Sequence, residues 1–258
     1  MRCCTITKND LISIGFWSCA LIALALLTLP LACIDQGSVR ILPLGDSITQ
    51  ADKNHDSYRR SLWHMLRNAG YETDFVGSLT TNHKGGPPSP DFDLDHEGHW
   101  GWRADEIING RASQSKLSKW LKDYTPDIVL IHLGSNDVSQ GQSVSSTVDE
   151  LEQIISILRR DNPRVKVLIA KLIPVTDQKI NNRINAFNDE IPRIALENDS
   201  PESRIIVVDL NNNFDAHSDT YDGVHPNSKG EQKMAQKWLD SLQPLMSPTV
   251  RPSAKLLD

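Results

Sequence analysis

Three polar clusters, each following an apolar stretch, carry residue types that could perform nucleophilic chemistry. They are Gly-Asp-Ser-Ile-Thr at 45–49, Gly-Ser-Asn-Asp at 134–137 and Asp-Gly-Val-His at 222–225. A serine hydroxyl becomes a good nucleophile when a base removes its proton, and the base needs a carboxylate that fixes its tautomer. Ser47, His225 and Asp222 supply these three groups. We therefore predict Ser47 as the nucleophile, His225 as the base and Asp222 as the carboxylate that orients it.

The negative charge that develops on a carbonyl oxygen during acyl transfer needs fixed hydrogen-bond donors. The candidates are the backbone amides of Ser47 and Gly101 and the side-chain amide of Asn136. Gly98 is the alternative to Gly101. A serine after a strand can also serve only as a helix cap, and an asparagine can serve only to shape a turn.

A second group of potentially reactive side chains lies shortly before Gly101. His96, Glu97 and His99 are typical metal ligands, but two histidines and one carboxylate without a third partner are a thin ligand set. We expect no metal and no other cofactor. These residues are instead expected to shape the loop that presents Gly101.

Several aromatic and basic side chains allow either a binding role or a packing role. Trp100 and Trp102 flank Gly101, and either could form a platform on which a sugar ring stacks. The alternative is that they pack beneath the loop. Arg59 is expected to be solvated or ion-paired, and residues 51–56 are polar and receive no assigned role.

The elements that must position these residues alternate between strands and helices. Apolar runs predict strands at 39–44, 73–76, 127–133, 165–173 and 204–208. Helical spacing predicts helices at 57–69, 104–124 with a break near Gly110, 144–160, 177–197 with an interruption at Pro192, and 228–242. This alternation indicates an α/β domain with a parallel sheet covered on both faces. Ligands bind beyond the carboxyl ends of such strands, where the three polar clusters fall.

Composition limits the possible partners and chemistry. The chain of 258 residues has 27 Lys and Arg against 33 Asp and Glu, a net charge of -6 without a basic block, which argues against a nucleic-acid partner. Its cysteines are Cys3, Cys4, Cys19 and Cys33. The downstream domain therefore has no thiol that could form a disulfide, attack a substrate or bind a metal.

The first 33 residues have the pattern of an export signal. Arg2 and Lys8 precede an apolar run at 11–32, and Cys33 follows it. Three outcomes are open: a lipoprotein anchored at Cys33, a cleaved secreted protein, or an uncleaved membrane anchor. In each case we expect the domain, at 38–245, to lie in the cell envelope or outside the cell, with a flexible tail at 246–258. The membrane would be contacted only through the leader or its lipid.

The four motifs together resemble the four sequence blocks of the SGNH/GDSL hydrolase superfamily, in the same order. They are Gly-Asp-Ser-Ile at 45–48, Gly101, Gly134-x-Asn136-Asp137 and Asp222-x-x-His225. This resemblance implies a flavodoxin-like three-layer α/β/α sandwich and hydrolysis of acyl esters without a metal. The G-x-S-x-G motif of α/β-hydrolases is not met, because position 49 is Thr.

A finer resemblance, from about residue 39 to 242, is to carbohydrate esterase family three and related acetylxylan esterases. It rests on the segments 57–59, 74–78, 95–102 and 222–226. It implies an acetylated polysaccharide, xylan first, as the substrate. A lipid-directed esterase, lysophospholipase or thioesterase is the alternative, and a non-catalytic carbohydrate-binding module on the same fold is a remote one.

Overall fold

The structure is a computed structural model that describes residues 37–248. The leader predicted at 1–33 and the tail beyond 248 lie outside these residues. Met246, predicted as the first residue of the tail, is instead buried and belongs to an apolar core cluster. Within the described range, every helix is too short or too polar to cross a lipid bilayer.

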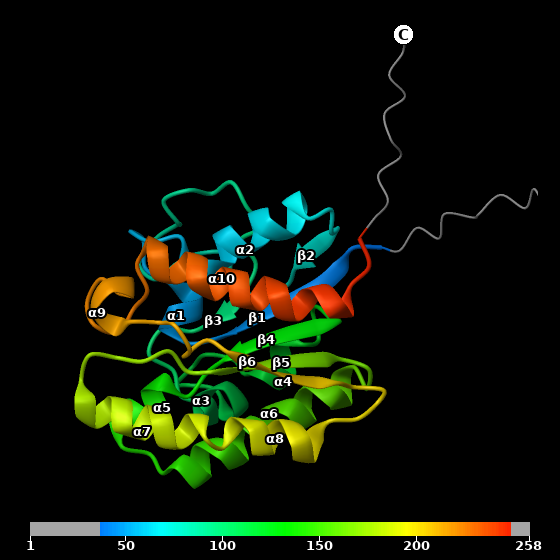
Figure 1. Cartoon of the computed structure of the whole chain (residues 1–258). Helices are drawn as coiled ribbons and strands as arrows, with labels where there is room; N and C mark the ends of the chain where they lie inside the picture. Colours follow the sequence, from blue (N-terminus) through cyan, green and yellow to red (C-terminus); the bar gives the residue numbers. More distant parts are fainter. Residues whose placement is uncertain (1–36, 249–258) are drawn as a thin grey trace, which may run out of the picture. The chain divides into compact units, whose positions relative to one another are not determined.

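A parallel sheet of six strands forms the centre of the domain (Figure 1). The strands are β1 (Val39–Gly45), β2 (Thr73–Phe75), β3 (Glu97–Gly98), β4 (Ile128–His132), β5 (Lys166–Lys171) and β6 (Ile205–Asp209). Their order is β2-β1-β4-β5-β6, and β3 pairs with the carboxyl end of β1 through Leu44–Glu97 and Gly45–Gly98. The predicted parallel sheet is confirmed, while the two-residue strand β3 lies in a segment predicted to be a loop.

Helices cover both faces of the sheet (Figure 1). Helices α2 (Ser57–Asn68) and α10 (Ser228–Leu242) lie on one face, and α3 (Ala104–Asn109), α6 (Val144–Asp161), α7 (Gln178–Asn188) and α8 (Ile191–Asn198) lie on the other. Each layer packs on its own apolar core. All five residues of β4 are buried, as expected for a strand covered on both sides. The three-layer α/β/α architecture is therefore confirmed.

Two predicted helix breaks are confirmed, and three further short helices were not predicted. The helix predicted at 104–124 is divided at Gly110 into α3 and α4 (Leu117–Trp120), because Gly110 has φ of 85° and ends α3. Pro192 lies in the first turn of α8, where proline is tolerated, so α8 begins after α7 at the predicted interruption. The short helices α1 (Ser47–Gln50), α5 (Ser135–Gln140) and α9 (Ala216–Asp219) fall in the polar segments that follow strands.

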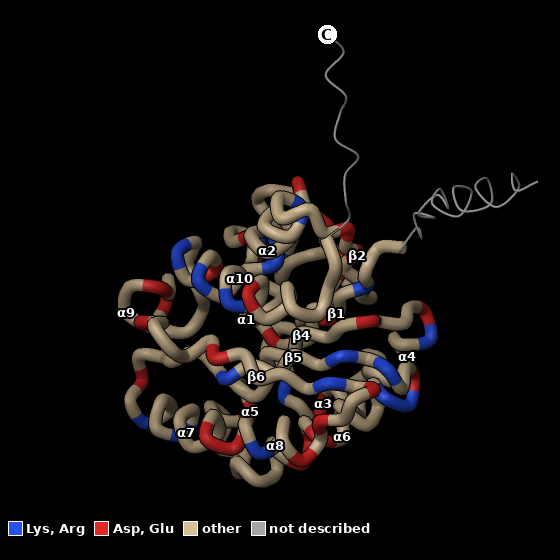
Figure 2. Tube along the Cα trace, turned by 45° about the vertical axis from the view of Figure 1, so that its right-hand side comes forward, with Lys and Arg blue, Asp and Glu red and all other residues tan. Residues whose placement is uncertain are grey.

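Charged side chains are distributed over the whole domain. In Figure 2, Lys and Arg residues lie interspersed with Asp and Glu residues over both helical layers. Opposite charges are also paired at short range, as in Arg40–Asp127 at 3.0 Å and Arg60–Asp91 at 2.6 Å.

Candidate active site

Ser47 lies at the carboxyl end of β1, where the strand turns directly into α1. Asp46 caps this short helix, since its Oδ1 accepts a hydrogen bond from the Ile48 amide at 2.9 Å. Gly45 is required by close packing, because a Cβ there would lie 2.4 Å from the backbone oxygen of His132. The Ser47 side chain is 7% exposed and is fixed at the first helical position.

Ser47, His225 and Asp222 form a continuous hydrogen-bonded series, although 178 residues separate the serine from the histidine. His225 Nε2 lies 2.9 Å from Ser47 Oγ, and His225 Nδ1 lies 2.8 Å from Asp222 Oδ2. The other carboxylate oxygen accepts from the amides of Val224 at 3.0 Å and His225 at 2.8 Å. This geometry directs an Nδ1 proton to the carboxylate and leaves Nε2 to accept the serine proton.

The Asp222 carboxylate is stabilised in its charged form. Burial alone would raise its pKa, but hydrogen bonds from the backbone amide and imidazole of His225 outweigh that effect and hold the pKa below its ordinary value. The carboxylate is therefore ionised at neutral pH, as the orientation of the imidazole requires.

The segment containing Gly101 is held against the Ser47 turn from two directions. Pairing of β3 with β1 places it there, and the His99 amide donates to the Gly45 oxygen at 2.9 Å. From the other side, Asn136 Nδ2 donates to the Trp102 oxygen at 2.8 Å. Asp137, the next residue, accepts from the Ala104 amide at 3.0 Å. We call these two bonds from the first turn of α5 the α5 clasp.

The three predicted oxyanion donors each keep an N–H group without an acceptor in the described part of the chain. Asn136 Nδ2 carries a second proton that the Trp102 oxygen does not use. Within residues 37–248, the backbone amides of Ser47 and Gly101 have no other acceptor. The amide of Gly98, by contrast, donates to His96 Nδ1 at 2.9 Å. Gly101 is therefore the better of the two candidate glycines.

The polar residues before Gly101 bind one another and the neighbouring loops. His96 Nε2 lies 3.2 Å from the Thr81 oxygen, and burial lowers the pKa of His96 well below its ordinary value. His99 Nε2 lies 2.8 Å from one Glu97 oxygen. The other Glu97 oxygen accepts from the Ser78 amide at 2.6 Å. These contacts give the loop a rigid shape.

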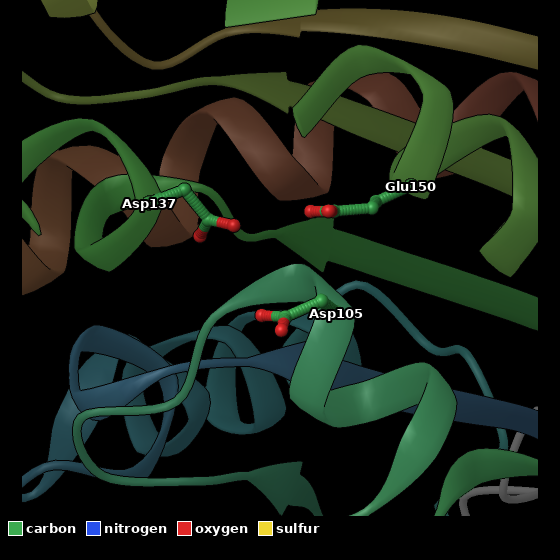
Figure 3. Close-up of side chains that lie close together, drawn as sticks. All are labelled: Asp105, Asp137 and Glu150. Atoms are coloured by element: carbon green, nitrogen blue, oxygen red, sulfur yellow. The ribbon is translucent and has the colours of Figure 1, made fainter. Parts of the chain in front are cut away.

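One carboxylate cluster in the described domain could offer oxygens to a cation. Asp105 of α3, Asp137 of α5 and Glu150 of α6 point toward one another, with ligand atoms within 4.8 Å (Figure 3). Burial raises the pKa of Asp137 to about 7 and also raises that of Glu150. A proton held by these carboxyl groups can therefore reduce the repulsion among them without a metal ion. The sequence does not single it out, because its members lie on three separate helices.

The two tryptophans beside Gly101 have different surroundings. Trp100 is half-buried, and its ring lies nearly parallel to the rings of His225 at 4.8 Å and His83 at 4.4 Å. Trp102 is 4% exposed and packs on the His99 and Trp120 rings. The structure therefore does not support Trp102 as a stacking platform and favours the packing alternative. Both tryptophans adjoin a cavity of about 640 Å³.

Arg59 differs from its predicted solvated or ion-paired state. Its guanidinium is buried and donates to the backbone oxygens of Thr49 at 2.9 Å, Gln50 at 3.2 Å and Leu94 at 2.9 Å, and to the Asn82 side chain at 3.0 Å. Burial lowers its pKa to about 10. Arg59 therefore links the segment directly after Ser47 to the long loop that precedes β3. In the sequence, the sign of a special role for Arg59 was the segment 57–59, on which the resemblance to carbohydrate esterase family three partly rests.

Comparison with known proteins agrees with this geometry. The model of the GDSL-like lipase/acylhydrolase family matches residues 44–233. The structure of a carbohydrate esterase family 3 protein from Talaromyces cellulolyticus superposes with a TM-score of 0.70 at 34% identity, over 80% of this chain and 97% of that one. A multidomain esterase from Ruminococcus flavefaciens is 31% identical over 225 residues, which are 80% of this chain and 29% of that protein. An acetylxylan esterase from Xylanibacter ruminicola is 31% identical over 136 residues, 44% of this chain and 28% of that protein.

The chain thus spans less than a third of the length of these two esterases, but nearly all of the Talaromyces structure. The family match includes the Ser47 turn, the α5 clasp and the Asp222–His225 loop. The protein belongs to the GDSL-like lipase/acylhydrolase family and has the three-layer α/β fold of the SGNH hydrolases.

Proposed function

We propose that the protein hydrolyses O-acetyl esters of a polysaccharide, acetylated xylan first. The observation that carries the catalytic half is the series Asp222–His225–Ser47, with contacts of 2.8 and 2.9 Å. The substrate half is supported by the similarity to a family 3 carbohydrate esterase and an acetylxylan esterase.

The reaction proceeds in two steps at Ser47. His225 takes the hydroxyl proton as Ser47 Oγ attacks the acetyl carbonyl, and the amides of Ser47, Gly101 and Asn136 bind the resulting oxyanion. His225 then gives the proton to the departing sugar oxygen, which leaves an acetyl-enzyme. Water enters, loses a proton to His225 and attacks the acetyl group. Acetate departs, and the proton returns to Ser47.

The space directly beside the nucleophile is too small for a long acyl chain. A cavity of about 10 Å³ adjoins Ser47 and is lined by Ile48, Ala51, Tyr221 and His225, among others. A volume of that order holds about one water molecule. A long alkyl chain would instead need a continuous apolar channel.

Acetate release from acetylated xylan, pectin, chitin and peptidoglycan tests the substrate, and nitrophenyl acetate and octanoate test the acyl length. We expect release from acetylated xylan and a kcat/KM at least about 100-fold higher for acetate than for octanoate. Ser47→Ala, measured in parallel, separates this activity from contaminants. A preference for octanoate, with no release from any polymer, would instead indicate a lipid-directed esterase.

The proposed substrate is a polymer, so we also propose that the domain functions in the cell envelope or outside the cell. This rests on residues 1–33 of the sequence, above all on Cys33 after an apolar run. Incorporation of labelled palmitate into the wild type but not into Cys33→Ser is the result expected for a lipoprotein. If neither protein is labelled, its location decides between the other two outcomes. Protein in the medium would indicate a cleaved secreted protein, and protein in the membrane an uncleaved anchor.

A further inference from the structure

A second Asp-x-x-His pair lies beside the first. Asp52 and His55 have the same spacing as Asp222 and His225. His55 Nδ1 lies 2.7 Å from Asp52 Oδ1, and that oxygen accepts the Asn54 amide at 2.9 Å. The Asp222 pair repeats this arrangement, with its carboxylate bound to the imidazole Nδ1 and to the amide two residues further along.

The loop that carries the second pair is firmly held. Asn82 Nδ2 donates to the backbone oxygens of Asp52 at 3.0 Å and His55 at 2.6 Å. The loop is bracketed by Ala51 and Ser57, which have φ of 59° and 67°. Such conformations are costly for residues other than glycine and are concentrated at functional sites. The fold therefore holds the Asp52–His55 pair in a defined position.

The two imidazoles belong to one site. His55 and His225 both line the small cavity that adjoins Ser47. The Tyr221 ring lies near both imidazoles. Its centroid is 3.9 Å from that of His55, with 5° between the ring planes, and 5.7 Å from that of His225, with 15° between the planes. The hydroxyl of Ser47 already lies 2.9 Å from His225 Nε2. His55 is therefore not the base for Ser47 and is available for another part of the substrate.

That part is the alcohol portion of the ester. His225 must protonate the departing oxygen, so the alcohol lies next to His225 when the bond breaks. Tyr221, directly before the Asp222–His225 loop, and Val224, within it, are exposed apolar residues, 39% and 37% exposed. Among the described residues, His55 Nε2 has no hydrogen-bond partner, while its Nδ1 is fixed by Asp52. A ring with an apolar face and a hydroxyl fits these groups.

We propose that Asp52, His55 and Tyr221 form an alcohol-side subsite that binds a free hydroxyl adjacent to the ester. Asp52 fixes the imidazole so that Nε2 accepts a hydrogen bond from that hydroxyl, and Tyr221 and Val224 contact the carbon face of the ring. The subsite selects monoesters of vicinal diols, such as partly acetylated sugar rings. This inference rests on the proposed acetyl ester hydrolysis.

Two acetates that differ by a single hydroxyl test the subsite. They are cyclohexyl acetate and trans-2-hydroxycyclohexyl acetate, and the quantity measured is the ratio of their kcat/KM values. We expect the wild type to prefer the hydroxylated ester by at least about fivefold, the order of one neutral hydrogen bond. His55→Phe keeps a flat ring against Tyr221 but loses the nitrogen, and should abolish the preference. His55→Gln should restore part of it.

The matched control is His217→Phe, which replaces an exposed histidine on α9 and should keep the wild-type ratio. A wild-type ratio near one, or an unchanged ratio in His55→Phe, would overturn the subsite while leaving acetyl ester hydrolysis intact. If neither ester is hydrolysed, the proposed function fails. Nitrogen NMR of Ser47→Ala titrated with methyl β-xylopyranoside then decides the inference: a shifted His55 Nε2 signal supports it, and an unshifted one overturns it.

Discussion

Asn136 Nδ2 donates to the backbone oxygen of Trp102 at 2.8 Å, and this bond joins the helix after β4 to the loop that carries Gly101. In the proposed mechanism, one side chain therefore both offers an oxyanion donor and fixes the position of another. Asn136→Ala should lower kcat on nitrophenyl acetate by about 100- to 1000-fold, the usual loss for one such donor. KM should change little. A loss below about threefold in a folded variant would exclude Asn136 from the oxyanion site.

Asp222 holds the imidazole of His225 through Nδ1 at 2.8 Å. Asp222→Asn presents an amide in place of the carboxylate and favours the wrong imidazole tautomer, so kcat should fall by about 100- to 10,000-fold. The measurement is steady-state hydrolysis of nitrophenyl acetate, with circular dichroism to verify the fold. Near-wild-type kcat would show that the carboxylate does not orient the base.

The buried Asp137 carboxyl makes stability depend on pH. Burial raises its pKa in the folded protein to about 7, above an ordinary value of about 4. The folded state then binds this proton more tightly than the unfolded chain. The stabilising contribution is complete below about pH 4 and is lost as the pH rises through 7.

Asp137→Asn cannot ionise but keeps an oxygen for the Ala104 amide. The variant should therefore lose less free energy of unfolding than the wild type between pH 5 and pH 8, by on the order of 1–3 kcal/mol. Urea unfolding at the two pH values measures the difference. Asp149→Asn, at an exposed position of α6, is the control and should follow the wild type. Parallel behaviour of Asp137→Asn and the wild type would contradict the raised pKa.

Arg59 binds four oxygens that would otherwise lose their partner inside the protein. Arg59→Met should reduce the free energy of unfolding by about 3 kcal/mol, because it leaves buried acceptors unsatisfied. Arg59→Lys should recover only part, since an ammonium group cannot reproduce the planar set of donors. Urea unfolding compares both with Arg164→Met, an exposed arginine. Equal urea midpoints for Arg59→Met and Arg164→Met would contradict a structural role for Arg59.

The parallel sheet and most helices could be predicted from the sequence because their patterns are local. The apolar run around β4 and the 3.6-residue period of α6 are visible without tertiary information. The convergence of Ser47 and His225 could be predicted as well, since polar residues after parallel strands meet at one edge of the sheet.

The remaining features depend on contacts that no local pattern records. Arg59 looks like any helical arginine, and its burial follows from the loop folded over it. The Asp52–His55 pair repeats a spacing found in the sequence, but its place beside His225 depends on Asn82 and Tyr221. Trp102 is buried because α4 brings Trp120 against the same loop.

The activation of Ser47 by His225 is tested most directly with a fluorophosphonate, which reacts with activated serines and stays attached. Mass spectrometry of the digested protein should place the label on Ser47 in the wild type, with none in Ser47→Ala and a rate at least about 100-fold lower in His225→Ala. Label on another serine, or an equal labelling rate in His225→Ala, would contradict the account.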